Sequence, residues 1–324
     1  MDADDVVRLR LCGQQLREPF AATTEAALQN LLAVQAQEFP YARWTLAQRT
    51  AAGSGSAAGI EQAVSEGTVL RTHILRPTWH FVHRNDLRWL LALSAPRVHQ
   101  ANAATYRRTG IDPADAARSS GVLISGSPVR SAGGDLKQTY ALFDERVPAA
   151  PAGLMERPRA LAELARRYFT SRGPATEKDC ADWSRLTLSD VRTGLHLARE
   201  TAPEALETAT VDGVTCYYKP TPDAGGAGRP GRLDLIQCYD EYVMGYSKTR
   251  YFLGGPAPFV PVAREPRHLV LRDGRLAGVW RHNLVRGGCE LDVRLDSSHP
   301  DDEPELSRVA AAYSRFLGIP AVRR

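Results

Sequence analysis

The order of helix-forming and β-rich segments in the first hundred residues constrains the fold most. Three segments carry apolar residues at helical intervals, and they cover residues 23–35, 41–50 and 60–67. A threonine caps the first segment, and Gly67 ends the third. Two alternating, β-rich segments follow at 68–75 and 77–83. This order is that of a winged helix, in which one helix can enter a DNA groove while the ribbon lies along the backbone, although many winged helices bind proteins instead.

A similar order recurs after a long helix predicted at 84–108. Helices are predicted at 158–173, 174–186 and 187–200, and a strand-like segment follows at 211–220. The two regions share architecture and not sequence, so we interpret them as an internal repeat. The last region is richer in β-structure. Asp273-Gly274 is typical of a tight hairpin turn, and one amphipathic helix is predicted at 307–319.

The composition is that of a globular chain without a membrane segment or metal site. Hydrophobic residues make up 43% of the 324 residues, and apolar runs such as 87–95 reach about half of the roughly 20 residues that span a bilayer. The N-terminus is acidic and lacks a hydrophobic leader, so neither export nor membrane insertion is predicted. The five cysteines are scattered and the histidines lack ligand spacing. We therefore expect reduced thiols, a cytoplasmic location and no metal or other cofactor.

The charge of the chain permits contact with nucleic acid without demonstrating it. The net charge is +4, and only four of the 41 basic residues are lysines. Arginine is the better donor to phosphate, but a GC-rich genome also produces an arginine-rich chain. Arg71 and Arg76 flank the predicted ribbon, and Arg43 lies on the helix that follows Pro40. Each of these could hold a phosphate or be a plain surface charge.

Two glutamines, Gln35 and Gln37, stand at the end of the helix predicted at 23–35. Pro40 stops that helix or forces a turn. Taken alone, such a pair is typical of a helix cap or of a solvent-facing helix end. Glu38 lies next to them and is a rival candidate for a general base.

The strand predicted at 77–83 carries a second candidate site. Trp79 alternates with Thr78 and His80, so one face of the ribbon is aromatic and the other polar. In a functional interpretation, Thr78 and His80 lie near a damaged nucleotide or its phosphate, and Trp79 packs behind them. In the alternative, Trp79 belongs to the core and His80 is a buried, hydrogen-bonded histidine.

The motifs of this chain together resemble the AlkZ-like family of winged-helix DNA glycosylases. The resemblance covers most of the chain and is carried by VQAQEFPYARWTLAQRT, TVLRTHILRPTWHFVHRNDLRWL, RGPATEKDCADWSRL and CYDEYVMGYSKTR. It implies an α+β, mainly α fold of three tandem winged-helix units in a C-shaped body. The expected units are residues 1–110, 111–225 and 226–324. The resemblance also implies removal of bulky N7-alkylguanines, interstrand crosslinks included, in DNA repair or in self-resistance to a genotoxic natural product.

The resemblance implies roles for particular residues. The family's two catalytic glutamines correspond to Gln35 and Gln37, whereas a related, YcaQ-like branch has an aspartate in the second place. The family's third unit carries a hairpin that contacts the lesion, which implies DNA contacts for Lys248 and Arg281.

Two amides suit the chemistry that the resemblance implies. An N7-alkylguanine already bears a positive charge and leaves the sugar readily. The enzyme then has to place a water against the anomeric carbon and to stabilise the oxocarbenium ion that develops on the sugar. We expect Gln37 to orient the water and Gln35 to assist through the sugar or the same water. No lysine stands near the pair, which agrees with water as the nucleophile. Asp240 and Glu241 are adjacent and point to different sides of their element, so we expect them to be structural.

Two hypotheses remain open from the sequence. The first is a monofunctional glycosylase that acts on double-stranded DNA carrying alkylated purines, associates with the nucleoid through DNA, and needs no membrane and no obligatory protein partner. The second is a non-catalytic winged-helix DNA-binding protein or transcriptional regulator, which the repeated helix-turn-helix pattern also fits. Release of a base from adducted DNA would distinguish the two.

Overall fold

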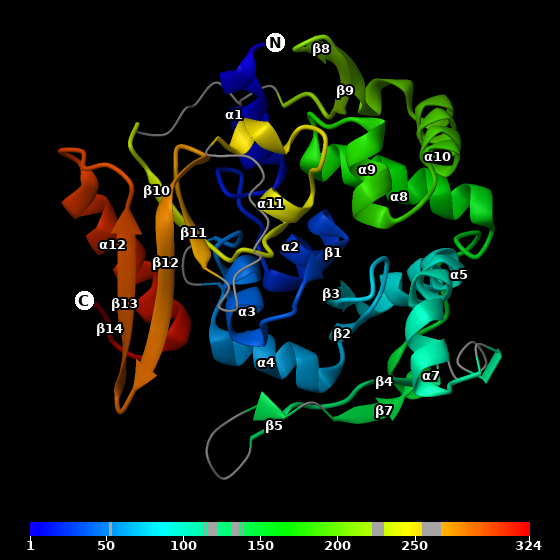
Figure 1. Ribbon diagram of the computed structural model, residues 1–324, viewed down its shortest axis with the longest axis horizontal. Coiled ribbons are helices and arrows are strands. Elements are labelled where there is room, and N and C mark those ends of the chain that lie inside the picture. The colour runs from blue at the N-terminus through cyan, green and yellow to red at the C-terminus, as the bar shows by residue number, and fades with distance from the viewer. Residues whose placement is uncertain are drawn as a thin grey trace.

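The computed structural model describes residues 1–51, 54–112, 114–115, 122–130, 136–137, 139–221, 230–254 and 267–324, which form an α+β fold with several small sheets (Figure 1). The first region contains α2 (Thr24–Leu31), β1 (Ala33–Gln35), α3 (Phe39–Ala47), α4 (Ala57–Glu66), β2 (Val69–His73) and β3 (Trp79–His83). Its strands form one antiparallel sheet in the order β1-β3-β2. The predicted succession of helices and a ribbon is confirmed in this region.

The segment that carries the first glutamine is a strand, which corrects the helix predicted at 23–35. Helix α2 ends at Leu31, and Leu32 takes a positive φ of 66° that the helix cannot continue through. The next residues pair with β3, and Gln35 lies opposite His80. Helical periodicity could not reveal this strand because its partner lies in a later part of the chain.

The second region repeats this order, as the sequence predicted. After α5 (Arg84–Thr109) and α7 (Phe143–Arg146), it contains α8 (Arg157–Arg172), α9 (Glu177–Ser184), α10 (Leu188–Thr201), β8 (Glu207–Val211) and β9 (Val214–Tyr218). Two short two-stranded sheets precede α8, one of β4 (Leu123–Ser125) with β7 (Tyr140–Leu142) and one of β5 (Val129–Arg130) with β6 (Leu136–Lys137), both antiparallel. An isolated bridge between Ala175 and Tyr217 ties the β8–β9 ribbon to the turn before α9, much as β1 pairs with β3.

The last region is built on a five-stranded sheet. Its strands are β10 (Leu233–Ile236), β11 (His268–Arg272), β12 (Arg275–Val285), β13 (Gly288–Leu295) and β14 (Ala321–Arg323), in that spatial order. The Asp273-Gly274 turn is confirmed, and both residues have positive φ, 48° and 79°. The helices here are α11 (Glu241–Met244) and α12 (Asp302–Leu317). The described residues of this region contain no helix-turn-helix pair like those of the first two, so only the β-rich part of the prediction is confirmed.

The hydrophobic cores cross the predicted unit boundaries. One core joins Leu70 and Val82 of the first ribbon to Tyr168 on α8. A second joins α3 and α4 to the five-stranded sheet and α12, and a third joins the N-terminal helix α1 (Ala3–Gly13) to β10 and β11. Figure 1 accordingly shows the first region between the other two. The division at residues 110 and 225 therefore stays a prediction. Among the described residues, no helix is both long enough and apolar enough to span a membrane.

Candidate functional site

Residues 35–37, which we call the QAQ turn, join β1 to α3. The Ala36 amide donates to Trp79 O at 2.7 Å, so the pairing with β3 extends one residue beyond β1. The Arg71 guanidinium donates to two carbonyl oxygens of the turn, at 3.0 Å from Nε to Ala36 O and 3.4 Å from Nη2 to Gln37 O. A proline in the first turn of α3 fixes where the helix begins. The backbone of the QAQ turn is therefore held from the ribbon side.

The two glutamine side chains lie in different environments. Gln35 is 3% exposed, and its Oε1 is buried without a hydrogen-bond partner. Gln37 is exposed, and its Oε1 is 3.5 Å from the Trp79 amide that could donate to it, a long hydrogen bond. Thr78 Oγ1 is also buried without a partner. Gln35 stands opposite His80, and Thr78 lies two residues before His80, immediately ahead of β3. Each of the two unpartnered oxygens is therefore able to accept a hydrogen bond from a water or a ligand.

Glu241, at the start of α11, anchors the backbone of the QAQ turn from the opposite side. It is fully buried, and its Oε1 accepts a hydrogen bond from Gln35 N at 3.0 Å. Its Oε2 accepts hydrogen bonds from Arg172 Nη2 and Trp183 Nε1, both at 2.7 Å, and Arg76 Nη2 lies 4.0 Å from Oε1. Burial alone would raise the pKa of Glu241, but the charges of Arg172 and Arg76 and the hydrogen bonds lower it below its ordinary value. The carboxylate is therefore ionised and fixes the position of Gln35.

His80 and Arg76 are buried beside this anchor. His80 is 0% exposed, with Nδ1 2.8 Å from Thr78 O and Nε2 3.0 Å from Arg76 Nη2. A guanidinium only donates, so Nε2 must accept and Nδ1 carries the proton. Burial and then the charge of Arg76 hold the pKa of His80 well below its ordinary value. Burial also lowers the pKa of Arg76 to about 10, which leaves it protonated at neutral pH. The structure therefore places His80 as a neutral, hydrogen-bonded histidine in the interior, as the alternative interpretation had it.

Trp79 and Arg71 form the accessible side of the ribbon near the QAQ turn. Both are partly exposed, and the Arg71 guanidinium lies 4.5 Å from the centre of the Trp79 ring. His73 packs against the same indole, with ring centres 4.2 Å apart. This surface combines a positive charge with an aromatic face directly beside Gln37, a combination that suits a phosphate and a base.

The other predicted DNA contacts are Arg43, Arg281 and Lys248. Arg43 is buried on α3 and forms an ion pair with Glu61 on α4. Arg281 is exposed on β12, where its Nε is 3.2 Å from Asp292 Oδ2. Lys248 is exposed and lines a surface depression together with residues of α9 and β9. The structure thus brings together the ribbon residues and the glutamines, and Arg43 lies near the same Phe39 ring as Arg71.

The remaining carboxylates near the turn have partners of their own. Asp240 pairs with Arg49 at 2.6 Å and Glu241 with Arg172 at 2.7 Å, and all four side chains are fully buried, which agrees with the structural role predicted for the two carboxylates. Glu38 Oε2 lies 3.3 Å from His268 Nε2, and Glu38 Oε1 is buried without a partner. Among the described residues, no group of three or more His, Cys, Asp and Glu side chains is placed to bind a metal.

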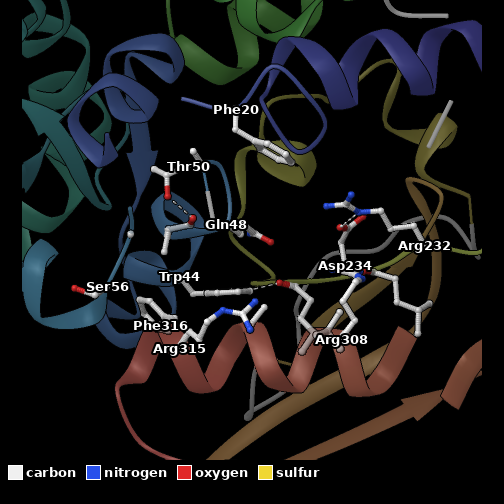
Figure 2. Close-up of a pocket in the computed structure, with 17 residues that line it drawn as sticks. Phe20, Trp44, Gln48, Thr50, Ser56, Arg232, Asp234, Arg308, Arg315 and Phe316 are labelled. Atoms are coloured by element: carbon white, nitrogen blue, oxygen red, sulfur yellow. Dashed lines mark hydrogen bonds and ion pairs between the residues drawn. The ribbon is translucent and has the colours of Figure 1, made fainter. Parts of the chain in front are cut away.

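A cavity of about 340 Å³ lies elsewhere, between α3, β10 and α12 (Figure 2). Trp44 forms part of its wall and donates from Nε1 to Leu235 O at 2.6 Å. Figure 2 shows Phe20 across the open space from Trp44. No residue of the QAQ turn lines this cavity, so its volume does not identify the candidate site.

Comparisons with known proteins cover almost the whole chain. The sequence profile described as "DNA glycosylase AlkZ-like" matches residues 28–120 and 112–316. Among solved structures, the Streptomyces sahachiroi DNA glycosylase AlkZ is similar over 100% of both chains, with a TM-score of 0.71 and 18% sequence identity. That structural likeness shows a common fold. No curated protein sequence matches this chain.

Proposed function

The chain belongs to the AlkZ-like family of DNA glycosylases, and we propose that it is a monofunctional enzyme that hydrolyses the N-glycosidic bond of bulky N7-alkylguanines in double-stranded DNA. The observation that carries this proposal is the QAQ turn, with one glutamine exposed and the other buried with an unpartnered amide oxygen. Interstrand crosslinks through guanine N7 present the same cationic leaving group and are substrates on this proposal. The biological role is then DNA repair or self-resistance to a genotoxic compound.

The proposed mechanism assigns separate tasks to the two amides. Gln37, which is exposed beside Trp79, orients a water towards the anomeric carbon. Two buried oxygens without partners, Gln35 Oε1 and Thr78 Oγ1, bind that water or stabilise the positive charge that develops on the sugar. The cationic guanine takes the bonding electrons and departs as a neutral base. The water then adds to the oxocarbenium ion and releases its proton to solvent, because a glutamine amide cannot accept a proton at neutral pH.

The proposed DNA surface is the side of the first region that exposes Gln37, Trp79 and Arg71. Arg281 and Lys248 are exposed, and on this proposal they contact DNA further from the lesion, within a concave body made of the three predicted units. Arg43, Arg76 and His80 are buried, so we propose that they support the site from within and do not bind phosphate directly.

The proposal is tested by base release from a duplex that carries one N7-alkylguanine. Release by the wild type, and none by a Gln35→Ala, Gln37→Ala double variant with an unchanged melting temperature and circular dichroism spectrum, is the expected result. Equal release by both proteins would remove the glutamines from the mechanism. Binding to DNA without release from any of several adducts would instead favour the non-catalytic winged-helix protein.

Arg71→Ala is expected to lower kcat for base release about 10- to 100-fold, because the turn loses the donor to two of its carbonyls and small misplacements of catalytic groups cost this much. Single-turnover kinetics on the same duplex would measure the effect. Arg84→Ala is the matched control, since it removes the same charge near the other end of the ribbon, where Arg84 donates to Arg146 O at 3.3 Å. Equal losses in both variants would mean that Arg71 acts only through general attraction to DNA.

A further inference from the structure

A second cavity lies between the tip of the β2–β3 ribbon and helix α5. Its volume is about 260 Å³. The ribbon contributes His73 and Pro77, and α5 contributes the apolar side chains of Leu91, Ala95 and Val98. Ligand sites that hold a whole drug-sized molecule typically measure about 300–1,000 Å³. The cavity is smaller than these sites, so it suits one substituent of a larger molecule whose remaining part is bound elsewhere.

The lining of this cavity combines apolar side chains with a few polar groups. No Asp, Glu, Lys or Arg side chain contributes to it, and its other polar groups are His99, Asn102 and Tyr106. His99 Nδ1 lies 2.9 Å from the Tyr106 hydroxyl, so these two groups largely satisfy each other. Burial and then the nearby charge of Arg71 lower the pKa of His73, which is neutral at pH 7. A phosphate or another charged group would find no Asp, Glu, Lys or Arg partner here, whereas an apolar or aromatic group would contact Leu91, Ala95 and Val98.

The cavity is next to the QAQ turn. His73, which lines it, packs against Trp79 with ring centres 4.2 Å apart, and the Trp79 amide is 3.5 Å from Gln37 Oε1. On the other side, Pro77 lines the cavity and precedes Thr78, whose hydroxyl is one of the unpartnered polar atoms of the site. Residues at the tip of the ribbon therefore contact both the cavity and the QAQ turn.

We infer that this cavity binds the uncharged aromatic or apolar substituent carried on N7 of the damaged guanine, and so selects bulky adducts over methyl adducts. The inference rests on the proposed function, because it takes the QAQ turn as the place of the damaged nucleotide. Base and sugar are held at the QAQ turn, and the substituent extends past Trp79 into the space between Pro77 and α5. An adduct without such a substituent leaves the cavity empty and loses that binding energy.

The test fills the cavity from α5 and measures binding, not activity. Ala95→Phe and Val98→Phe each place a ring in the cavity, and Ala92→Phe adds the same ring on the exposed side of the same helix. All three are made in a Gln37→Ala background, so that the DNA stays intact. Fluorescence anisotropy then gives Kd for duplexes that contain guanine, N7-methylguanine or N7-benzylguanine, with 2′-fluoro sugars at the adducts to prevent spontaneous base loss.

The Gln37→Ala protein is expected to bind the benzyl duplex about 10-fold more tightly than the methyl duplex, the size of effect that one small apolar group produces in a pocket. The preference should vanish when either Ala95 or Val98 is replaced and persist when Ala92 is replaced. A preference that survives both cavity-filling variants, or no preference in the parent protein, would overturn the inference. Base release by the wild type from an N7-benzylguanine duplex with ordinary deoxyribose sugars tests the glycosylase proposal separately. Base release without tighter binding of the benzyl duplex rejects only the role of the cavity. Tighter binding of the benzyl duplex without base release rejects only the proposed glycosylase activity.

Discussion

Replacing Glu241 by alanine is expected to lower the free energy of unfolding by about 3–5 kcal/mol, the cost of removing one partner from a buried ion pair. Arg172, the partner of Glu241, is 0% exposed, and Arg76 is 7% exposed. In the variant both guanidinium groups stay in the interior without a carboxylate, and the amide of Gln35 loses its acceptor. Urea denaturation followed by circular dichroism would measure the change.

A matched control separates this effect from the loss of any ion pair. Asp292 pairs with Arg281 and Arg294 on the exposed face of the β12–β13 hairpin. Asp292→Ala should therefore change the free energy of unfolding by only about 0–1 kcal/mol. A loss below about 1 kcal/mol in Glu241→Ala would contradict the role of the buried carboxylate as an anchor.

The same carboxylate sets an acid limit on stability. The pKa of Glu241 in the folded protein lies below its ordinary value of 4.5, so its contribution is fully present above that pH and is lost as the pH falls through the folded pKa. The Glu241→Gln variant cannot titrate at this position. Its stability should therefore fall less steeply below about pH 4.5 than that of the wild type, although it is lower at neutral pH.

The sequence predicted more of the fold than of the site. Helix caps, the Asp273-Gly274 turn and alternating strands are local signals, and the elements that they predict are present. The strand that carries Gln35 was mistaken for a helix end because its apolar run has no period of its own, and only pairing with β3 makes it a strand. The anchors of that strand were also missed. Arg172 and Gln237 contact its backbone from distant parts of the chain, and no local pattern marks them.

Burial also changed the interpretation of three predicted DNA contacts. The sequence places three charged or polar residues, Arg43, Arg76 and His80, near a predicted binding surface. Nothing in the sequence distinguishes them from Arg71, which is partly exposed at that surface. The structure gives each of them a partner within the protein: the partly buried Glu61 for Arg43, and one another for Arg76 and His80. Which arginine of a ribbon faces outward depends on the helices that cover its other face, and that packing cannot be predicted from spacing alone.

Gln35→Ala and Gln37→Ala are each expected to lower kcat for release of an N7-alkylguanine about 10²- to 10³-fold, the usual cost of removing one preorganised polar group from a transition state. Single-turnover release from an adducted duplex would measure both. Gln48→Ala is the matched control, because Gln48 ends α3, lines the separate cavity near Trp44 and contacts Asp240 at 3.5 Å. An unchanged rate is expected for it.

The double variant decides whether the two amides act on one water. Groups that act as a unit are not additive, so losing both should cost little more than losing the more important one. If instead the two losses multiplied, Gln35 and Gln37 would serve separate steps.

The pH dependence of the base-release rate tests separately whether an ionising residue takes part in the reaction. Glu241 is held ionised by Arg172, and His80 is held neutral by burial, so neither titrates near neutral pH.

The wild-type rate should therefore be flat between about pH 6 and 9, since a cationic leaving group needs no general acid and the amides supply no titrating base. A bell-shaped profile would show that an ionising residue takes part, and Glu38, whose Oε1 is buried without a partner one residue beyond the QAQ turn, would be the first to replace. A flat profile with non-additive losses at Gln35 and Gln37 leaves positioning of water by two amides as the source of catalysis. In that case the substrate range is set by which guanine adducts are already cationic and by which of them the residues around the site bind.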